Sequence, residues 1–201
     1  MGKYEWRLIL VLTAICVFSG GVLGWVNSLT APVIEAQQEL AKQRALQKAL
    51  PDATVFTEDP TLLAELEGAG RSGIMEVYRA YHDGEDKGYV FIVDQRGYAG
   101  PIRMAVGVTQ SGNLSALTVI SQSETPGLGA KINNDKFLQQ PAFREAKVGM
   151  ELAVTKDKGE VDAVASATIS SRAVVHGVNA ALSAAQSLLE VETTNGGVDV
   201  D

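Results

Sequence analysis

The chain has 201 residues, enough for one sizeable domain with additional segments, and its 46% hydrophobic content is ordinary for a globular protein. Any membrane signal must therefore be local. The formal net charge of −7 at pH 7 argues against nucleic acid as a partner.

The first predicted element is a membrane span. Leu8 to Val26 contains no charged residue, and as a helix it would be roughly 28 Å long, about one hydrocarbon core. Lys3 and Arg7 precede it, and no Lys or Arg follows until Lys42. The positive-inside rule then predicts a cytoplasmic N-terminus, with the rest of the chain on the periplasmic side or on the outer face of a single-membrane cell.

A cleaved signal peptide is the alternative interpretation of this segment. Its apolar region would be unusually long, and Ser28-Leu29-Thr30 is only a fair cleavage site. The only cysteine, Cys16, lies in the predicted span, so we expect neither disulfides nor thiol chemistry in the exported part. Residues 27–201 carry a net charge of −8, which argues against electrostatic docking on lipid.

Two helices should follow the span. Residues 31–50 read as a helix with Pro32 suited to its first turn, or as a stalk that continues from the membrane span, and Pro51-Asp52 should end it. A shorter helix is expected over 61–67, and a flexible turn over 68–73.

The pattern then changes to strands over 74–81, 88–93, 102–108 and 114–121, joined by turn signals, which predicts an antiparallel meander. A helix over 134–147 and short strands over 150–154 and 161–165 come next. The clearest helix covers 171–190, with Ser170 or Ser171 as its N-cap.

The predicted fold class is therefore α+β, with a mostly antiparallel sheet flanked by helices behind one transmembrane helix. We divide the chain into four expected regions. They are the cytoplasmic N-terminus and span (1–30), the helical stalk and linker (31–73), the globular domain (74–190) and a disordered acidic tail (191–201).

Several familiar sites are excluded by the sequence. His82 and His176 lie far apart without ligand spacing, so we expect no metal site. Neither a nucleophile elbow nor a Walker loop is present. Gly127-Leu128-Gly129 fails the dinucleotide fingerprint, because Ile132 stands where its third glycine is needed.

Two stretches remain as candidates for chemistry. In Ser123–Ile132, Pro126-Gly127 has type II turn chemistry, and the small Gly127 and Gly129 would let backbone N–H groups approach a ligand. An ordinary connecting loop explains the same residues. In Asp162–Ser171, small and hydroxyl-bearing residues lead into a helix whose N-terminus could bind a phosphate. The alternative there is a small-residue turn before a capped helix.

Read in order, these stretches resemble a known family. GYAGPIRM at 97–104, ETPGLG at 124–129 and SATISS at 166–171 resemble the FMN-binding G subunit of Rnf electron-transport complexes. They are also similar to its paralogue, the C subunit of the sodium-pumping NADH:quinone oxidoreductase, which is usually longer. The resemblance runs from the membrane span to the final helix.

The resemblance implies FMN esterified through its phosphate to a threonine by a flavin transferase, which takes FMN from FAD. The transferase recognises Asp-x-x-Ser/Thr-Gly-Ala-Thr, which places the acid at Asp162, the alanine at Ala167 and the acceptor at Thr168. The chain departs from this pattern at Ala165 and Ser166. Ser166 and Ser170 are less favoured as acceptors.

The resemblance also implies a set of residues near the cofactor. Besides Thr168 they are Glu124, Thr125, Gly127, Leu128, Gly129, Ala167 and Ser170. With no catalytic residue or iron–sulfur ligand set of its own, the chain should be a non-autonomous redox subunit. It would relay electrons beside other membrane subunits of a complex that couples electron flow between ferredoxin and NAD to sodium or proton movement. The alternative is a stand-alone membrane-anchored FMN-binding carrier or sensing module.

Overall fold

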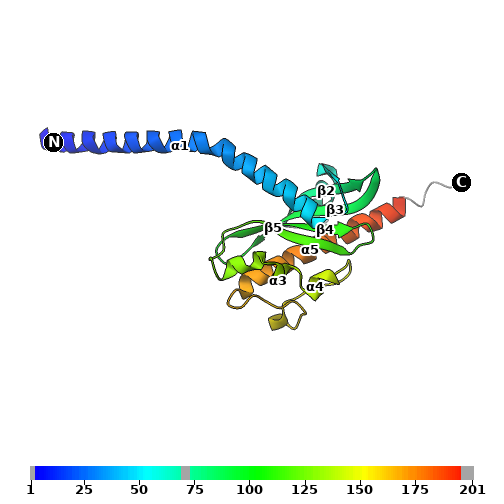
Figure 1. Ribbon diagram of the computed structural model, residues 1–201. Helices are drawn as coiled ribbons and strands as arrows, with labels where there is room; N and C mark the ends of the chain where they lie inside the picture. The colour runs from blue at the N-terminus through cyan, green and yellow to red at the C-terminus, as the bar shows by residue number, and fades with distance from the viewer. Residues whose placement is uncertain (1–2, 69–72, 196–201) are drawn as a thin grey trace. The chain divides into compact units, whose positions relative to one another are not determined.

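The computed structural model describes residues 3–68 and 73–195 and divides into two compact units, Met1–Ala41 and Lys42–Asp201 (Figure 1). The first unit is the N-terminal part of helix α1 (Lys3–Ala49). Large apolar side chains are exposed all along it, from Leu8 to Leu29. Within the described residues α1 is the one helix that is long and apolar enough to cross a membrane.

The predicted span and stalk form one continuous helix, so Pro32 lies inside α1 and not in the first turn of a new helix. The residues before it remain helical. The Ser28 hydroxyl donates to the Trp25 carbonyl at 2.7 Å, and the Thr30 hydroxyl donates to the Val26 carbonyl at 3.1 Å. Side-chain hydroxyls thus bond backbone carbonyls in the turn next to the proline, which lacks an N–H donor.

The second unit is built on a five-stranded sheet in the order β1-β2-β3-β4-β5, with every neighbouring pair antiparallel. The predicted meander is confirmed as β2 (Ile74–His82), β3 (Glu85–Arg96), β4 (Pro101–Thr109) and β5 (Leu114–Gln122). The edge strand β1 (Val55–Glu58) was not predicted, because four mostly exposed residues carry too little alternation. Helix α2 (Pro60–Gly68) confirms the expected short helix.

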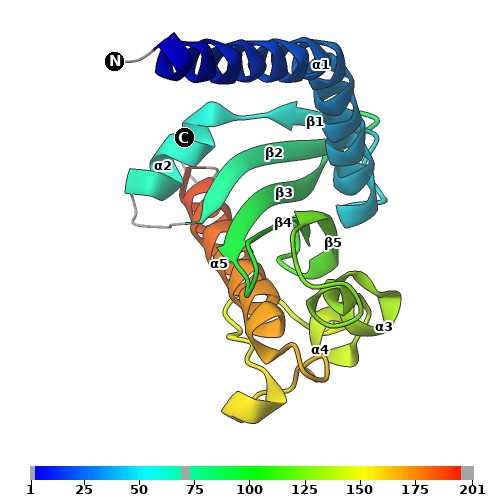
Figure 2. The ribbon, with the colours of Figure 1, turned by 90° about the vertical axis from the view of Figure 1, so that its left-hand side faces the viewer.

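The sheet is covered on both faces (Figures 1 and 2). On β3, Tyr89, Phe91 and Val93 pack in the cluster that contains helix α5 (Thr168–Asn195). The alternate residues Val90 and Ile92 pack against the end of α1. Since both faces are buried, β3 reads as a continuous apolar run.

The segment after β5 is mostly irregular. Its short elements are η1 (Gly129–Asn133), α3 (Asp135–Leu138), α4 (Pro141–Arg144) and η2 (Thr155–Asp157). The single helix expected over 134–147 is wrong in its continuity: α3 and α4 are two separate short helices, and Pro141 begins the second. The strands expected over 150–154 and 161–165 were wrong: only Val154 and Val161 pair, as a single parallel bridge. The residues between Val154 and Val161 form the η2 turn, which ends at Lys158 in the left-handed conformation.

Helix α5 confirms the clearest sequence prediction, but it begins three residues earlier than expected. Ser170 and Ser171 lie inside its first turn, so neither is the N-cap. In the predicted flexible turn, residues 69–72 lie outside the described residues, as do 196–201 of the predicted tail. Residues 191–195, which were expected to be disordered, are helical and belong to α5. The four region boundaries remain predictions.

Candidate functional site

Three segments far apart in sequence surround a cavity of about 440 Å³. They are the β3–β4 loop, the loop after β5 and the start of α5. The lining residues are Tyr98, Glu124, Thr125, Leu128, Gly129, Ser166, Ala167, Thr168, Ile169 and Ser170. Of the residues expected near the cofactor, only Gly127 is not in this lining. Tertiary structure thus brings the two candidate stretches together at one site.

Glu124 joins the three segments. Its side chain is buried, and Oε1 accepts hydrogen bonds from the backbone N–H groups of Tyr98 at 2.7 Å and Ala99 at 3.1 Å. The Ser170 hydroxyl donates to Oε2 at 2.8 Å. A buried carboxylate needs such donors, and here each oxygen has at least one.

Two glycines make room for that carboxylate. A Cβ atom at Gly97 would lie 2.2 Å from Oε1 of Glu124, and one at Gly129 would lie 2.4 Å from Oε2. The small size of Gly129 therefore makes room for Glu124, and Gly129 also lines the cavity. Gly127 has φ of +78°, and the Leu128 N–H donates to the Thr125 carbonyl, which confirms the predicted Pro-Gly turn.

Thr168 is the first residue of α5 and is partly exposed. Its Oγ1 lies 2.8 Å from Nζ of Lys156, in η2. The first N–H groups of a helix have no intrahelical acceptors, so this hydroxyl lies beside both a cation and free backbone donors. Sequence reasoning missed Lys156, because nothing in its own surroundings indicates a contact twelve residues along the chain.

An ion pair holds η2 against the helix. Arg172, one turn after Thr168, donates from Nε and Nη2 to the two carboxylate oxygens of Asp157 at 2.6 and 2.7 Å. The hydrogen bonds from Arg172 lower the pKa of the Asp157 carboxyl below its usual value. This bidentate contact fixes the residue next to Lys156.

The segment before Thr168 is tightly constrained. Ser166 has φ of +63°, in the left-handed region that favours glycine. The Val164 N–H donates to the Ser171 hydroxyl at 3.0 Å, and that hydroxyl donates to the Ala167 carbonyl at 3.0 Å. Ser171 thus stabilises the turn from inside the helix, which explains why it is not the cap.

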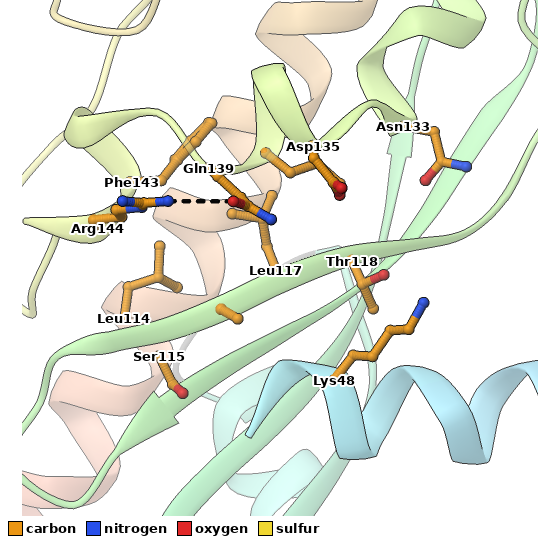
Figure 3. Close-up of a pocket in the computed structure, with 12 residues that line it drawn as sticks. Lys48, Leu114, Ser115, Leu117, Thr118, Asn133, Asp135, Gln139, Phe143 and Arg144 are labelled. Atoms are coloured by element: carbon orange, nitrogen blue, oxygen red, sulfur yellow. Dashed lines mark hydrogen bonds between the residues drawn. The ribbon is translucent and has the colours of Figure 1, made fainter. Parts of the chain in front are cut away.

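A second cavity, of about 520 Å³, lies along β5 beside α3, α4 and Lys48 (Figure 3). Arg144 donates to Gln139 across its wall at 3.2 Å. None of the residues singled out from the sequence lines it, so larger volume alone does not make it the candidate site. Among the described residues, no three His, Cys, Asp or Glu side chains are placed to hold a metal ion.

Comparison with known proteins finds relatives over most of the chain. Residues 97–183 match the FMN-binding domain family, and residues 7–48 match the RnfG N-terminal region. The G subunit of the Na⁺-translocating ferredoxin:NAD⁺ oxidoreductase complex of Acetobacterium woodii is 31% identical, over 92% of this chain and 94% of the relative. The proton-translocating counterpart of Clostridium ljungdahlii is also 31% identical, over 92% and 91%.

The fold is also found in a solved structure. The crystal structure of the C subunit of Na⁺-translocating NADH-quinone reductase from Parabacteroides distasonis matches with a TM-score of 0.57 and 21% identity, over 78% of this chain and 95% of that one. The chain belongs to the RnfG family, the G subunits of ion-translocating oxidoreductase complexes, and has an FMN-binding domain. This confirms the family resemblance drawn from the three motifs.

Proposed function

We propose that this chain carries FMN esterified to Thr168 and relays electrons within a membrane-bound, ion-translocating ferredoxin:NAD⁺ oxidoreductase complex. The supporting observation is the position of the Thr168 hydroxyl. It is partly exposed on the 440 Å³ cavity, at the first residue of α5 and 2.8 Å from Nζ of Lys156. The relatives named above are subunits of such complexes.

The residues around Thr168 fit a phosphate. A phosphodiester keeps one negative charge, and the start of α5 supplies free N–H groups and the positive end of the helix dipole. The dipole contributes about 0.3–1 kcal/mol at such a position. The Lys156 ammonium supplies a second favourable contact, and η2 is held in place by the Asp157–Arg172 pair.

The rest of the lining fits a flat, mostly apolar ring. Tyr98, Leu128 and Ile169 are 73%, 46% and 49% exposed, and all three line the cavity. Such exposed large apolar residues around one cavity are typical of a ligand site. FMN, when bound, supplies the electron-transfer chemistry, while the protein holds it and sets its surroundings. Glu124 shapes the wall, because its oxygens already accept hydrogen bonds from the protein.

Attachment requires a second enzyme. A threonine hydroxyl is a weak nucleophile without a base, and we expect a flavin transferase to supply one. Thr168 Oγ1 forms a bond to the FMN phosphorus of FAD, the pyrophosphate bond breaks with AMP as the leaving group, and the hydroxyl proton passes to the transferase. The tether then prevents loss of the cofactor on the outer side of a membrane.

The chain would work beside other subunits, because one flavin can only exchange electrons with neighbouring redox centres. We place the N-terminus in the cytoplasm and the flavin domain outside, on the basis of Lys3 and Arg7. A stand-alone membrane-anchored carrier is the alternative. Copurification of multi-span subunits with the full chain would support the complex, and their absence under gentle detergent extraction would favour the carrier.

Intact mass tests the covalent site. The full chain and its Thr168→Ala variant are each expressed with a flavin transferase. We expect a gain of about 438 Da, FMN minus water, in the wild type only. Ser166→Ala is the matched control, because it removes a neighbouring exposed hydroxyl and should keep the adduct. An adduct on Thr168→Ala, or none on the wild type with an active transferase, would overturn the assignment.

A further inference from the structure

The backbone of Asp162 is held by one side chain, that of Gln140, which lies between α3 and α4. The Asp162 N–H donates to Oε1 of Gln140 at 2.7 Å, and Nε2 of Gln140 donates to the Asp162 carbonyl at 3.0 Å. Nε2 also donates to the Phe137 carbonyl at 3.2 Å, which fixes the amide itself. A single amide thus satisfies both backbone groups of Asp162, as a neighbouring strand would.

The Asp162 side chain is exposed, in contrast to its fixed backbone. Within residues 3–68 and 73–195, its carboxylate makes no hydrogen bond or ion pair. The carboxylate therefore contributes no contact to the fold, although its position along the chain is fixed. Such a group is available to another molecule.

The backbone of the segment between Asp162 and Thr168 is also held in place. The Val164 N–H is bonded to Ser171, and the Ala167 N–H donates to the Val164 carbonyl at 3.0 Å. The side chains of Ala165 and Ser166 are exposed, so this segment forms an accessible surface. The backbone of this segment is thus held at Asp162 by Gln140 and at Ala167 by the Ser171 hydroxyl.

We propose that Gln140 is a positioning residue for flavin attachment. Its clamp on Asp162 presents the carboxylate and the Thr168 hydroxyl to the flavin transferase as one preformed surface. This inference rests on the proposed function. A preformed surface removes an ordering cost from binding, so loss of the clamp should weaken recognition of the chain and leave the chemical step unchanged.

The chain contains a matched control for this clamp. Asn179 of α5 holds Leu152 in the same way: Oδ1 accepts from the Leu152 N–H at 2.9 Å, and Nδ2 donates to the Leu152 carbonyl at 2.8 Å. Neither Gln140 nor Asn179 lines the 440 Å³ cavity. Gln140→Met and Asn179→Leu therefore each remove a pair of hydrogen bonds to the backbone of one residue, next to the acceptor segment in the first variant and away from it in the second. Gln140→Met also removes the contact with the Phe137 carbonyl.

The test is the initial rate of adduct formation, followed by intact mass, with purified full-length chain in detergent, flavin transferase and FAD. We expect Gln140→Met to raise the half-saturating chain concentration about fivefold, the factor for one net hydrogen bond. The maximal rate and final adduct extent should match the wild type. Asn179→Leu should leave the half-saturating concentration unchanged. If Gln140→Met instead partly unfolds the chain, the final extent of adduct formation would fall below that of the wild type.

Hydrogen exchange tests the clamp without the transferase. Gln140→Met should speed amide exchange in a peptide covering 160–167, and Asn179→Leu should not. An unchanged half-saturating concentration for Gln140→Met, or equal increases in both variants, would overturn the positioning role while wild-type attachment still supports the proposed function. Failure of the wild type to gain FMN in the same assay would instead overturn the proposed function and this inference with it.

Discussion

The Ser170 hydroxyl donates a 2.8 Å hydrogen bond to Oε2 of Glu124, although 46 residues separate them. Both side chains are buried. This contact joins the loop after β5 to the first turn of α5, and the other oxygen of Glu124 holds the β3–β4 loop. One carboxylate therefore determines how the three walls of the candidate flavin cavity meet.

Removing the Glu124 carboxylate should destabilise the fold. Glu124→Ala leaves the Ser170 hydroxyl and the Tyr98 and Ala99 N–H groups without their acceptor, at a cost of about 1–3 kcal/mol. Glu124→Gln keeps an acceptor for the loop and should cost less. Urea unfolding of the chain followed by circular dichroism measures both. A stability loss equal for the two variants would mean that the hydrogen bonds are not the cause.

Ser166 has a φ of +63°, a conformation that favours glycine, which is the residue that the family resemblance implies at this position. A residue with a Cβ atom adopts this conformation at a steric cost of about 1–2 kcal/mol. Glycine avoids that cost, but it loses more backbone entropy on folding, so the two effects partly cancel. Ser166→Gly should therefore change stability by less than about 1 kcal/mol and keep flavin attachment. Ser166→Val should destabilise by more, since β-branched residues rarely adopt positive φ. Thermal unfolding and intact mass test both, and a Val variant as stable as wild type would contradict this account.

Local patterns carried much of the fold. Apolar strand patterns bounded by turn signals predicted β2 to β5, and the apolar face of α5 was correctly identified. The errors arose where tertiary contacts decide the backbone. Ser171 resembled a cap but stabilises the preceding turn, and the strands expected on either side of η2 reduce to one pair.

The site was predictable in its motifs and not in its long-range partners. The two motif stretches meet at the 440 Å³ cavity. They could be recognised in the sequence because both contain unusual groups of small and hydroxyl-bearing residues. Lys156 and Gln140 are single polar residues in irregular segments, and lysine and glutamine are common on any surface. Gly97 could be explained only once Glu124 was seen beside it.

Lys156 should restrain the attached flavin. Lys156→Met removes the ammonium 2.8 Å from Oγ1 of Thr168, and Lys156→Arg keeps a cation there. We expect attachment to proceed in both, because exposed ion contacts contribute only about 0.2–1 kcal/mol. Flavin fluorescence anisotropy should fall in the Met variant, as the tethered group moves more freely, and remain near wild type in the Arg variant. Equal anisotropy in all three proteins would argue against a Lys156 contact.

Gly107 permits the end of α1 to approach the sheet. A Cβ atom there would lie 2.1 Å from the Ala49 carbonyl oxygen, so Gly107→Ala forces backbone movement and should destabilise by about 1–3 kcal/mol. Gly68→Ala is the control, because nothing lies within 4 Å of its added Cβ. Urea unfolding should separate the two variants. Similar stabilities would show that α1 can shift without cost.

Asp59 should make the fold sensitive to acid. Its carboxylate accepts hydrogen bonds from the Thr61 hydroxyl, which is the largest cause of its lowered pKa, and from the N–H groups of Leu62 and Thr61 at the start of α2. The nearby charge of Arg79 acts in the same direction, and burial opposes it.

The sign of the pH effect follows from this shift. The folded pKa lies below the unfolded value of 3.8, so near and below that pH the unfolded state binds more protons. The contribution of Asp59 is therefore fully present above 3.8 and is lost as pH falls through the folded pKa. Asp59→Asn keeps an oxygen that can cap α2 but removes the charge. Its stability deficit relative to wild type, measured by urea unfolding, should be largest at neutral pH and shrink below pH 3.8. A deficit that stayed constant into acid would mean that the charge of Asp59 does not contribute to stability.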